Sequence, residues 1–347
     1  MSAQPYIVIY DGKKVKTYSS EILSNKSAKP LQEFKIKLIG AKLYPSYDCK
    51  AIFGLDKKFN VVELDPLTGK TSIRMEDIRK AFDRYDLILE EAEDFKGITS
   101  SRNGNCVAVI GWSGILVDKK GTIDMVERIE YRKRFTTEKY IRTEVDKWGA
   151  ERIITEEEEH LYTEKAHIDS GAISPDCKNV ALTESSLFER CYAAVYSLEA
   201  KKYNILRDVP YEEPLYEDVV WSRDSKIMCF FYRDKEFRFG IELFNLKGKS
   251  SQRFSLEFPI GGYDSSPMKQ EFALYSFSGE ILILDASKKV PSLKKLVAIG
   301  KDPISLKYSP CGKYLLAVNK KRIHIIDLNG KILTSLKGKF ATWFAVK

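Results

Sequence analysis

A repeated phrase of alternating strands around a serine-centred turn constrains this chain more than any other feature. Its clearest copy runs from Ile304 to Gly338, where hydrophobic and polar residues alternate with a period of two, as in half-buried strands. Residues 309–313 (Ser-Pro-Cys-Gly-Lys) form a tight turn between the first two strands, and Asn329-Gly330 is a strong hairpin signal between the third and fourth. This copy therefore predicts four antiparallel strands.

Further copies of the phrase predict a ring of such units. The turn serines are Ser46, Ser101, Ser174, Ser222, Ser266 and Ser309. The last four are roughly 43 to 48 residues apart, which is the period of a four-stranded propeller blade. The first two copies are more widely spaced because insertions lengthen them, and helical solenoids would not show this strand alternation. The repeat thus predicts an all-β fold with six complete blades.

The two ends of the chain are expected to supply a seventh blade. The segment from Tyr6 to Tyr18 aligns with the third and fourth strands of the last copy, and the segment from Phe340 to Lys347 resembles an innermost strand without a blade. Joining the ends would close the ring and cover edge strands that otherwise invite aggregation. We predict a single seven-bladed β-propeller domain over residues 1–347, closed by the N- and C-terminal strands, with insertions at about 74–95 and 130–165.

The turns resemble those of the WD40-like and TolB-like group of β-propellers, in which Ser-Pro-Asp-Gly-Lys turns link the inner strands. Residues 174–178 (Ser-Pro-Asp-Cys-Lys) and 309–313 carry the resemblance best, and it covers nearly the whole chain. The Gly-His openings and Trp-Asp endings of true WD40 repeats are missing, so the buried polar network of that family is not carried over. The resemblance implies the fold and no functional residue, because this fold hosts unrelated functions.

The first insertion predicts a short amphipathic helix. Ile78, Phe82, Tyr85 and Leu89 recur at helical spacing. One interpretation is that this face packs on the side of the propeller. The other is that Phe82 and Tyr85 dock to a partner protein.

The second insertion predicts a long hairpin that projects from the ring, with a solvated loop as the alternative. It begins with the basic residues 132–134 (Arg132, Lys133 and Arg134), passes a candidate turn at 146–149 and returns through an acidic run at 156–159. Pairing of a basic arm with an acidic arm would stabilise the hairpin internally. Long excursions from a compact repeat concentrate interaction surfaces, so the basic stretch and Trp148 at the tip are candidate partner-binding residues.

Common motifs of catalysis and nucleotide binding are absent from the sequence. There is no Gly-x-Ser-x-Gly elbow, no phosphate-binding Gly-x₄-Gly-Lys-Ser/Thr loop and no His-Glu-x-x-His helix. His160 and His167 beside the acidic run suggest a conceivable metal site, but ordinary surface histidines are the simpler interpretation, and His324 is expected to pack in a strand. We therefore expect no enzyme activity, no metal and no cofactor. A propeller enzyme with a site at the mouth of the channel is a further, less favoured alternative, and convergent carboxylates or a metal there would be its sign.

A cationic rim offers nucleic-acid binding as an alternative function. Loops between second and third strands share one face of a propeller, and several of them are basic. The candidate residues are Lys57, Lys58, Arg233, Lys235, Arg238, Lys320, Lys321 and Arg322. Solubility is the competing explanation, because turns assigned to the opposite face also carry lysines, namely Lys13, Lys14, Lys119, Lys120, Lys201, Lys202, Lys288 and Lys289.

Composition bears on compartment and partners. The six cysteines are far apart and form no Cys-x-x-Cys pair, so we expect free thiols in a reducing compartment. The N-terminus has no signal-like pattern and the chain no long apolar run, which predicts a cytoplasmic protein without membrane insertion. A formal charge of +8 with 31% charged residues is typical of a well-solvated surface, and abundant Lys, Glu and Ile would suit a thermophile. The predicted function is a non-catalytic protein-interaction scaffold within a larger complex.

Overall fold

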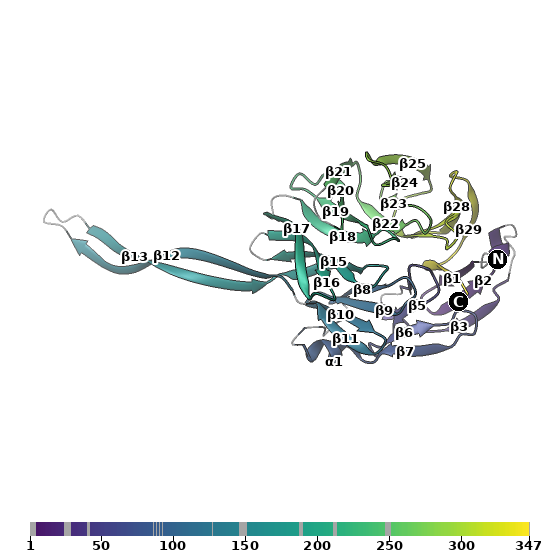
Figure 1. Ribbon diagram of the computed structural model, residues 1–347, viewed down its shortest axis with the longest axis horizontal. Coiled ribbons are helices and arrows are strands. Elements are labelled where there is room, and N and C mark those ends of the chain that lie inside the picture. The colour runs from purple at the N-terminus through teal and green to yellow at the C-terminus, as the bar shows by residue number, and fades with distance from the viewer. Residues whose placement is uncertain are drawn as a thin grey trace.

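Seven four-stranded antiparallel sheets form a closed ring in the computed structural model (Figure 1). The described residues are 5–23, 29–39, 42–85, 87, 89, 91, 93–126, 128–145, 151–186, 190–210, 214–246 and 251–346. Each sheet is one blade, and the first strand of a blade lines the central channel. The prediction of a seven-bladed, all-β propeller is confirmed.

Six blades follow the chain in order. Blade 1 contains β4 (Tyr44–Pro45), β5 (Ile52–Leu55), β6 (Val61–Leu64) and β7 (Thr71–Met75). Blade 2 contains β8 (Phe95–Ser100), β9 (Cys106–Gly111), β10 (Gly114–Lys119) and β11 (Thr122–Val126). Blade 3 contains β14 (His167–Ile173), β15 (Asn179–Ser186), β16 (Arg190–Ser197) and β17 (Lys202–Pro210). Blade 4 contains β18 (Leu215–Trp221), β19 (Ile227–Arg233), β20 (Phe239–Asn245) and β21 (Ser251–Leu256). Blade 5 contains β22 (Ile260–Ser265), β23 (Glu271–Ser276), β24 (Glu280–Asp285) and β25 (Ser292–Ala298). Blade 6 contains β26 (Pro303–Tyr308), β27 (Tyr314–Asn319), β28 (Ile323–Asp327) and β29 (Ile332–Leu336).

Blade 7 joins the two ends of the chain. Its strands, from the channel outward, are β30 (Phe340–Phe344), β1 (Tyr6–Tyr10), β2 (Lys14–Tyr18) and β3 (Gln32–Lys35), with a 3-10 turn η1 (Ser20–Leu23) between the last two. The closure by both termini and the inner position of the C-terminal strand are confirmed. The assignment of residues 6–18 to the third and fourth strands is wrong, because β3 follows them as the outer strand. They are the second and third strands.

The strand order defines two faces of the ring. Loops between second and third strands, and the connections between blades, lie on what we call the upper face. Loops between first and second strands, and between third and fourth strands, lie on the lower face. The corrected place of β1 and β2 moves Lys13 and Lys14 to the upper face, beside the predicted cationic rim.

Hydrogen bonds inside each first hairpin explain the repeated serine. In five blades the serine hydroxyl accepts a bond of 2.9 to 3.1 Å from the backbone N–H five residues later. The pairs are Ser46 with Ala51, Ser101 with Cys106, Ser174 with Asn179, Ser222 with Ile227, and Ser309 with Tyr314. These serines are buried, so the bonds satisfy polar groups that would otherwise be costly. The repeated turn is therefore a structural element.

Neighbouring blades pack through apolar residues and two fully buried tryptophans. Trp221 on β18 donates its indole N–H to the carbonyl oxygen of Ala172 in blade 3, at 2.8 Å. Trp343 on β30 donates to Lys307 in blade 6, at 3.1 Å. A buried indole stabilises by its large apolar area and needs a partner for its N–H. Both tryptophans therefore tie the first strand of one blade to that of the blade before it.

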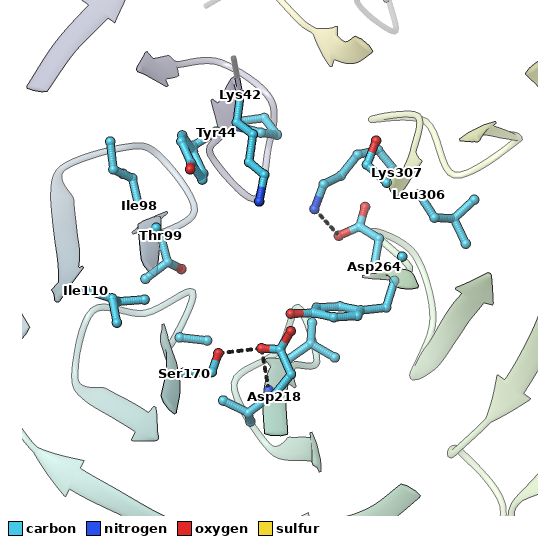
Figure 2. Close-up of a pocket in the computed structure, with 18 of the residues that line it drawn as sticks. Lys42, Tyr44, Ile98, Thr99, Ile110, Ser170, Asp218, Asp264, Leu306 and Lys307 are labelled. Carbon is cyan, nitrogen blue, oxygen red and sulfur yellow. Dashed lines mark hydrogen bonds and ion pairs between the residues drawn. The ribbon is translucent and has the colours of Figure 1, made fainter. Parts of the chain in front are cut away.

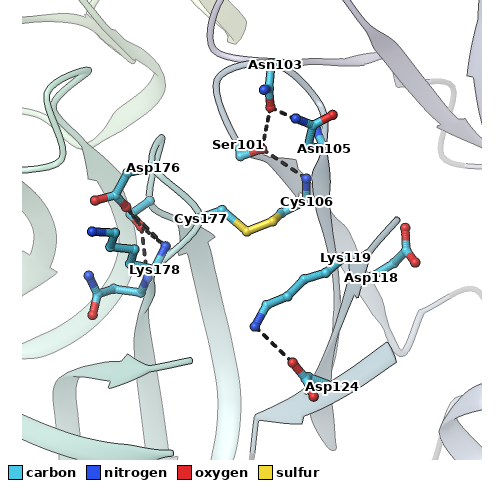
Figure 3. The surroundings of a disulfide bond; sticks show 12 residues. Ser101, Asn103, Asn105, Cys106, Asp118, Lys119, Asp124, Asp176, Cys177 and Lys178 are labelled. Atoms are coloured by element: carbon cyan, nitrogen blue, oxygen red, sulfur yellow. Dashed lines mark hydrogen bonds and ion pairs between the residues drawn. A yellow bond between two sulfur atoms is a disulfide. The ribbon is translucent and has the colours of Figure 1, made fainter. Parts of the chain in front are cut away.

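A disulfide joins Cys106 at the start of β9 to Cys177 in the β14–β15 turn (Figure 3). The expectation of six free thiols is thus wrong for this pair, and Cys49, Cys191, Cys229 and Cys311 are free. The repeat brings the two positions together. The equivalent turn residue of blade 2, Gly104, likewise faces Ala51, the residue before β5 in blade 1, and a Cβ at Gly104 would lie 2.9 Å from that of Ala51.

The first insertion packs against the propeller. Helix α1 (Ile78–Asp83) is only six residues long, and Phe82 is fully buried in the core between blades 1 and 2. The periodicity predicted a longer helix, but after Asp83 the chain turns, with the N–H groups of Tyr85 and Leu87 both donating to the carbonyl of Phe82. Leu89 is also buried in this core. Its helical spacing reflects packing of an irregular segment onto the blades.

The second insertion is a two-stranded arm that projects far from the ring (Figure 1). Strands β12 (Glu130–Val145) and β13 (Glu151–Lys165) pair antiparallel. Their register places residues 132–134 opposite 161–163, and the acidic run 156–159 opposite 136–139. The basic and acidic stretches therefore do not face each other as expected. Trp148 at the tip lies outside the described residues.

Among the described residues, no helix is long and apolar enough to cross a membrane.

Candidate functional site

The central channel holds a cavity of about 410 Å³ lined by the first strands of the blades. Five of these strands contain a β-bulge at the same place in the repeat. The bulged residues are Lys96, Asp169, Glu217, Gly261 and Ile304, and all of them line the cavity. A bulge leaves one residue out of the ladder and redirects its side chain. The repeat thus builds a ring of channel-facing positions.

Asp218 is the centre of a hydrogen-bonded cluster in this channel (Figure 2). Ser170 donates its hydroxyl to the Asp218 carboxyl at 2.5 Å, and the backbone N–H of Val219 donates at 2.9 Å. The Tyr263 hydroxyl also bonds to Asp218. Burial raises the pKa of Asp218, and these hydrogen bonds only partly offset it. Asp218 is therefore a buried carboxyl whose charged form is stabilised by three hydrogen-bond donors, while burial raises its pKa.

Charges of opposite sign line neighbouring parts of the channel. Blades 3 and 4 supply Asp169, Glu217 and Asp218, while blades 1 and 2 supply Lys42 and Lys96. Figure 2 shows the Lys42 ammonium group pointing into the channel toward the side that holds Asp218. The pKa of Asp169 is raised by burial and by the nearby Glu217, against the influence of Ser185 and Lys96. The two lysines can therefore hold an anionic group next to the buried carboxyls.

A second polar pair lies further along the channel. Lys307 is 3.7 Å from Asp264, and the backbone N–H of Tyr308 donates to the same carboxyl at 2.8 Å. Burial raises the pKa of Asp264, although Lys307 opposes the shift. The channel therefore has polar groups at two depths, with apolar side chains such as Ile98, Ile110 and Leu306 around them.

Metal-binding geometry is not found at this site. No three His, Cys, Asp or Glu residues in the described part of the chain are arranged to hold a metal ion. His167 instead stacks on Trp112, with ring centroids 3.9 Å apart, and His324 bonds to Ser335 at 2.9 Å. The side chain of His160 lies outside the described residues.

The predicted partner-binding residues are separated from this site. Phe82 has no exposed surface to offer a partner, so its packing interpretation is the one that the structure supports. Tyr85 is half-buried and donates its hydroxyl to the carbonyl of Ile123 at 3.2 Å. Residues 132–134 lie on β12, but their side chains are outside the described set, as is Trp148.

The predicted cationic residues all lie on the upper face, but several are ion-paired. Arg233 pairs with Glu217 at 3.0 Å, Arg238 with Asp234 at 2.7 Å, and Lys320 with Asp302 at 4.0 Å. Lys57 and Lys58 are exposed in blade 1, which blade 7 separates from blade 6. The rim is therefore two separate groups, of which the larger spans blades 4 to 6.

No family model matches the sequence, and no curated protein matches it. Solved structures do match in fold. The dihydro-heme d1 dehydrogenase NirN, in complex with DHE, has a TM-score of 0.55 and 12% identity, over 99% of this chain and 75% of that chain. A proposed 6-phosphogluconolactonase from Bacteroides uniformis has a TM-score of 0.58 and 14% identity, over 99% of this chain and 100% of its own. One from Bacteroides fragilis has 0.57 and 14%, over 98% of both chains.

These likenesses place the chain among the β-propellers and correct one expectation. We predicted a propeller without enzyme activity, yet the proteins that share this ring over nearly the whole chain include a dehydrogenase and proposed lactonases. The absence of familiar motifs does not exclude enzyme activity, because the residues that line the channel come from several blades. At 12–14% identity the likeness is one of fold, so the chemistry has to be argued from the residues of this chain.

Proposed function

We propose that this protein binds a small anionic, hydroxyl-bearing molecule in its central channel and acts on it by acid–base catalysis. The observation that carries the proposal is Asp218, a carboxyl with a raised pKa that is hydrogen-bonded to Ser170 and faces Lys42. A cavity of about 410 Å³ lies in the range of small-molecule sites, roughly 300–1,000 Å³.

Hydrolysis of a sugar lactone is the reaction that suits these groups best. Water adds to the lactone carbonyl, the ring C–O bond breaks, and the ring oxygen leaves as a hydroxyl after taking a proton. Asp218 can accept the proton of the attacking water and then give it to the ring oxygen, and Asp169 is a second buried carboxyl that can accept it. Lys42 and Lys96, from blades 1 and 2, can hold a phosphate or carboxylate group.

Acid release from 6-phosphoglucono-δ-lactone and from glucono-δ-lactone, followed in a pH-stat against spontaneous hydrolysis, tests the proposal. Asp218→Asn should lower the catalysed rate by roughly 100-fold or more, because general acid catalysis contributes about that much. Asp124→Asn is the matched control, since Asp124 pairs with Lys119 in the outer part of blade 2. A wild-type protein that neither accelerates hydrolysis nor binds 6-phosphogluconate in calorimetry would refute the proposal.

A second role, protein binding through the arm, is supported by the projection of β12 and β13 from the ring. A two-stranded ribbon has two open edges, which are ready sites for pairing with another chain. Residues 132–134 and Trp148 remain the predicted contacts. Replacing residues 131–164 by a short Gly-Ser linker should abolish capture of a stoichiometric partner, while channel ligand binding is retained. Identical partners with and without the arm would refute this role.

A further inference from the structure

A continuous surface crosses blades 4, 5 and 6 on the upper face. It is built from the loops 234–238, 257–259, 277–279, 299–302 and 320–322. Backbone hydrogen bonds connect these loops in sequence: the N–H of Phe277 donates to Pro259, that of Ile299 to Gly279, and that of Lys320 to Asp302, at 2.9, 2.9 and 3.2 Å. The first two loops flank the β20–β21 pair, in which Phe239 lies opposite Leu256. We call this the upper aromatic surface.

Three phenylalanine rings are exposed on this surface. Phe237 is 67% exposed, Phe258 44% and Phe277 45%. Phe277 lies against Gly261 at the channel, where an added Cβ would come within 2.7 Å of the ring. Phe258 and Phe277 lie on loops joined by the bond between Phe277 and Pro259. The Arg233 guanidinium lies over the Phe237 ring at 5.2 Å. Exposed apolar rings grouped on one face mark a binding surface. A ligand with flat apolar faces would cover these rings and remove their apolar area from water, which favours binding.

The same surface carries cations that are not neutralised. Among the described residues, no carboxylate lies within ion-pair distance of Lys235, Lys301, Lys321 or Arg322. All four are exposed. Lys235 is beside Phe237, and the other three follow Phe277 along the surface. Because these cations are spread over several loops, a ligand with negative groups repeated along its length would complement them.

Single-stranded nucleic acid fits this combination best. Its bases have flat π-faces that stack on aromatic side chains regardless of sequence, and its phosphates pair with lysine and arginine. An acidic peptide would satisfy the cations but would not need three exposed ring faces. We propose that the upper aromatic surface binds single-stranded RNA or DNA, with bases on Phe237, Phe258 and Phe277. The phosphates pair with the cations named above. This site is distinct from the channel chemistry.

Fluorescence anisotropy with labelled oligo(U) and oligo(dT) of about 12 nucleotides tests the proposal and separates RNA from DNA. The logarithm of the association constant should fall linearly with the logarithm of the salt concentration, with a slope of about −0.7 per phosphate contacted. Lys321→Glu with Arg322→Glu should therefore flatten the slope by roughly 1.4. Phe258→Ala and Phe277→Ala should each weaken binding by at least about 5-fold, with the slope unchanged.

The lower face of the ring provides a matched control. Lys201→Glu with Lys202→Glu removes two exposed lysines from the lower face and should leave binding as in the wild type. Circular dichroism of the phenylalanine variants should show the native fold, since these rings are exposed. No binding at low salt would overturn the proposal. Full affinity in the phenylalanine variants, or equal competition by polyglutamate, would also overturn it, because either result indicates a generic surface for acidic chains.

Discussion

Breaking the Cys106–Cys177 disulfide should lower the free energy of unfolding by an amount that depends on the length of the loop that the bond closes. The bond closes a loop of 71 residues between neighbouring blades. The entropy of closing such a loop corresponds to about 4 kcal/mol at 25 °C. With an unfolding entropy of about 2.1 cal/mol/K per residue, a chain of 347 residues should lose about 6 °C in melting temperature. The arm lies inside this loop, so the bond also joins the two blades from which it projects.

Scanning calorimetry with and without a phosphine reductant measures this effect. The wild-type protein should melt about 6 °C lower when reduced, and Cys177→Ser should melt at that lower temperature under both conditions. Cys49→Ser is the matched control, because Cys49 has the equivalent turn position with a positive φ of 58° but is a free thiol. Equal melting temperatures before and after reduction, with thiol labelling confirming that the bond was broken, would refute the reasoning.

Two further residues give predictions of stability. Glu184 is buried and accepts hydrogen bonds from the backbone N–H of Ile129, at the base of the arm, and from Tyr203; burial raises its pKa from 4.5 to about 8. Its stabilising contribution is complete below about pH 4.5 and is lost as pH rises through 8, so Glu184→Gln should remove up to roughly 5 kcal/mol of this pH dependence in urea titrations. An unchanged pH profile would contradict it. Trp221→Ala should cost about 3–5 kcal/mol in the same assay, and a loss below 1 kcal/mol would show that the inter-blade contact matters little.

The fold was readable from the sequence because each blade repeats the same local physics. A buried serine that hydrogen-bonds within its own hairpin recurs in five blades, for example Ser174 and Ser309, and alternation marks the strands around it. Strands were assigned wrongly where one local sequence pattern is compatible with two positions in a blade. The Asp11-Gly12 turn resembles the Asn329-Gly330 turn, but the first joins second and third strands and the second joins third and fourth. The pairings of β1 with β30 and of β2 with β3 separate these cases.

The residues of the candidate channel site were not named from the sequence, although the sequence carries a signal for them. Each bulged residue lies five positions before a turn serine, and the residue after it lies four positions before. Asp169 and Ser170 have these places before Ser174. Glu217 and Asp218 have them before Ser222. Motif searches look for residues close together in one segment, whereas these side chains meet only when the blades close into a ring. Aligning the blades on their serines would have placed them in one layer.

The repeat therefore gives the chain three kinds of position: turn serines, residues packed between blades, and bulged residues that face the channel. Turn serines must hydrogen-bond locally, and fully buried rings such as Trp221 must fill the space between blades, so neither is free to serve a ligand. The bulged positions have no ladder bond to maintain and face a cavity, so their side chains can vary with the chemistry of a ligand. Polar or charged residues at such positions are costly when partly buried unless they have partners, as Asp218 has in Ser170 and Glu217 has in Arg233. The proposed channel function therefore rests on the geometry of these groups together with the raised pKa of Asp218.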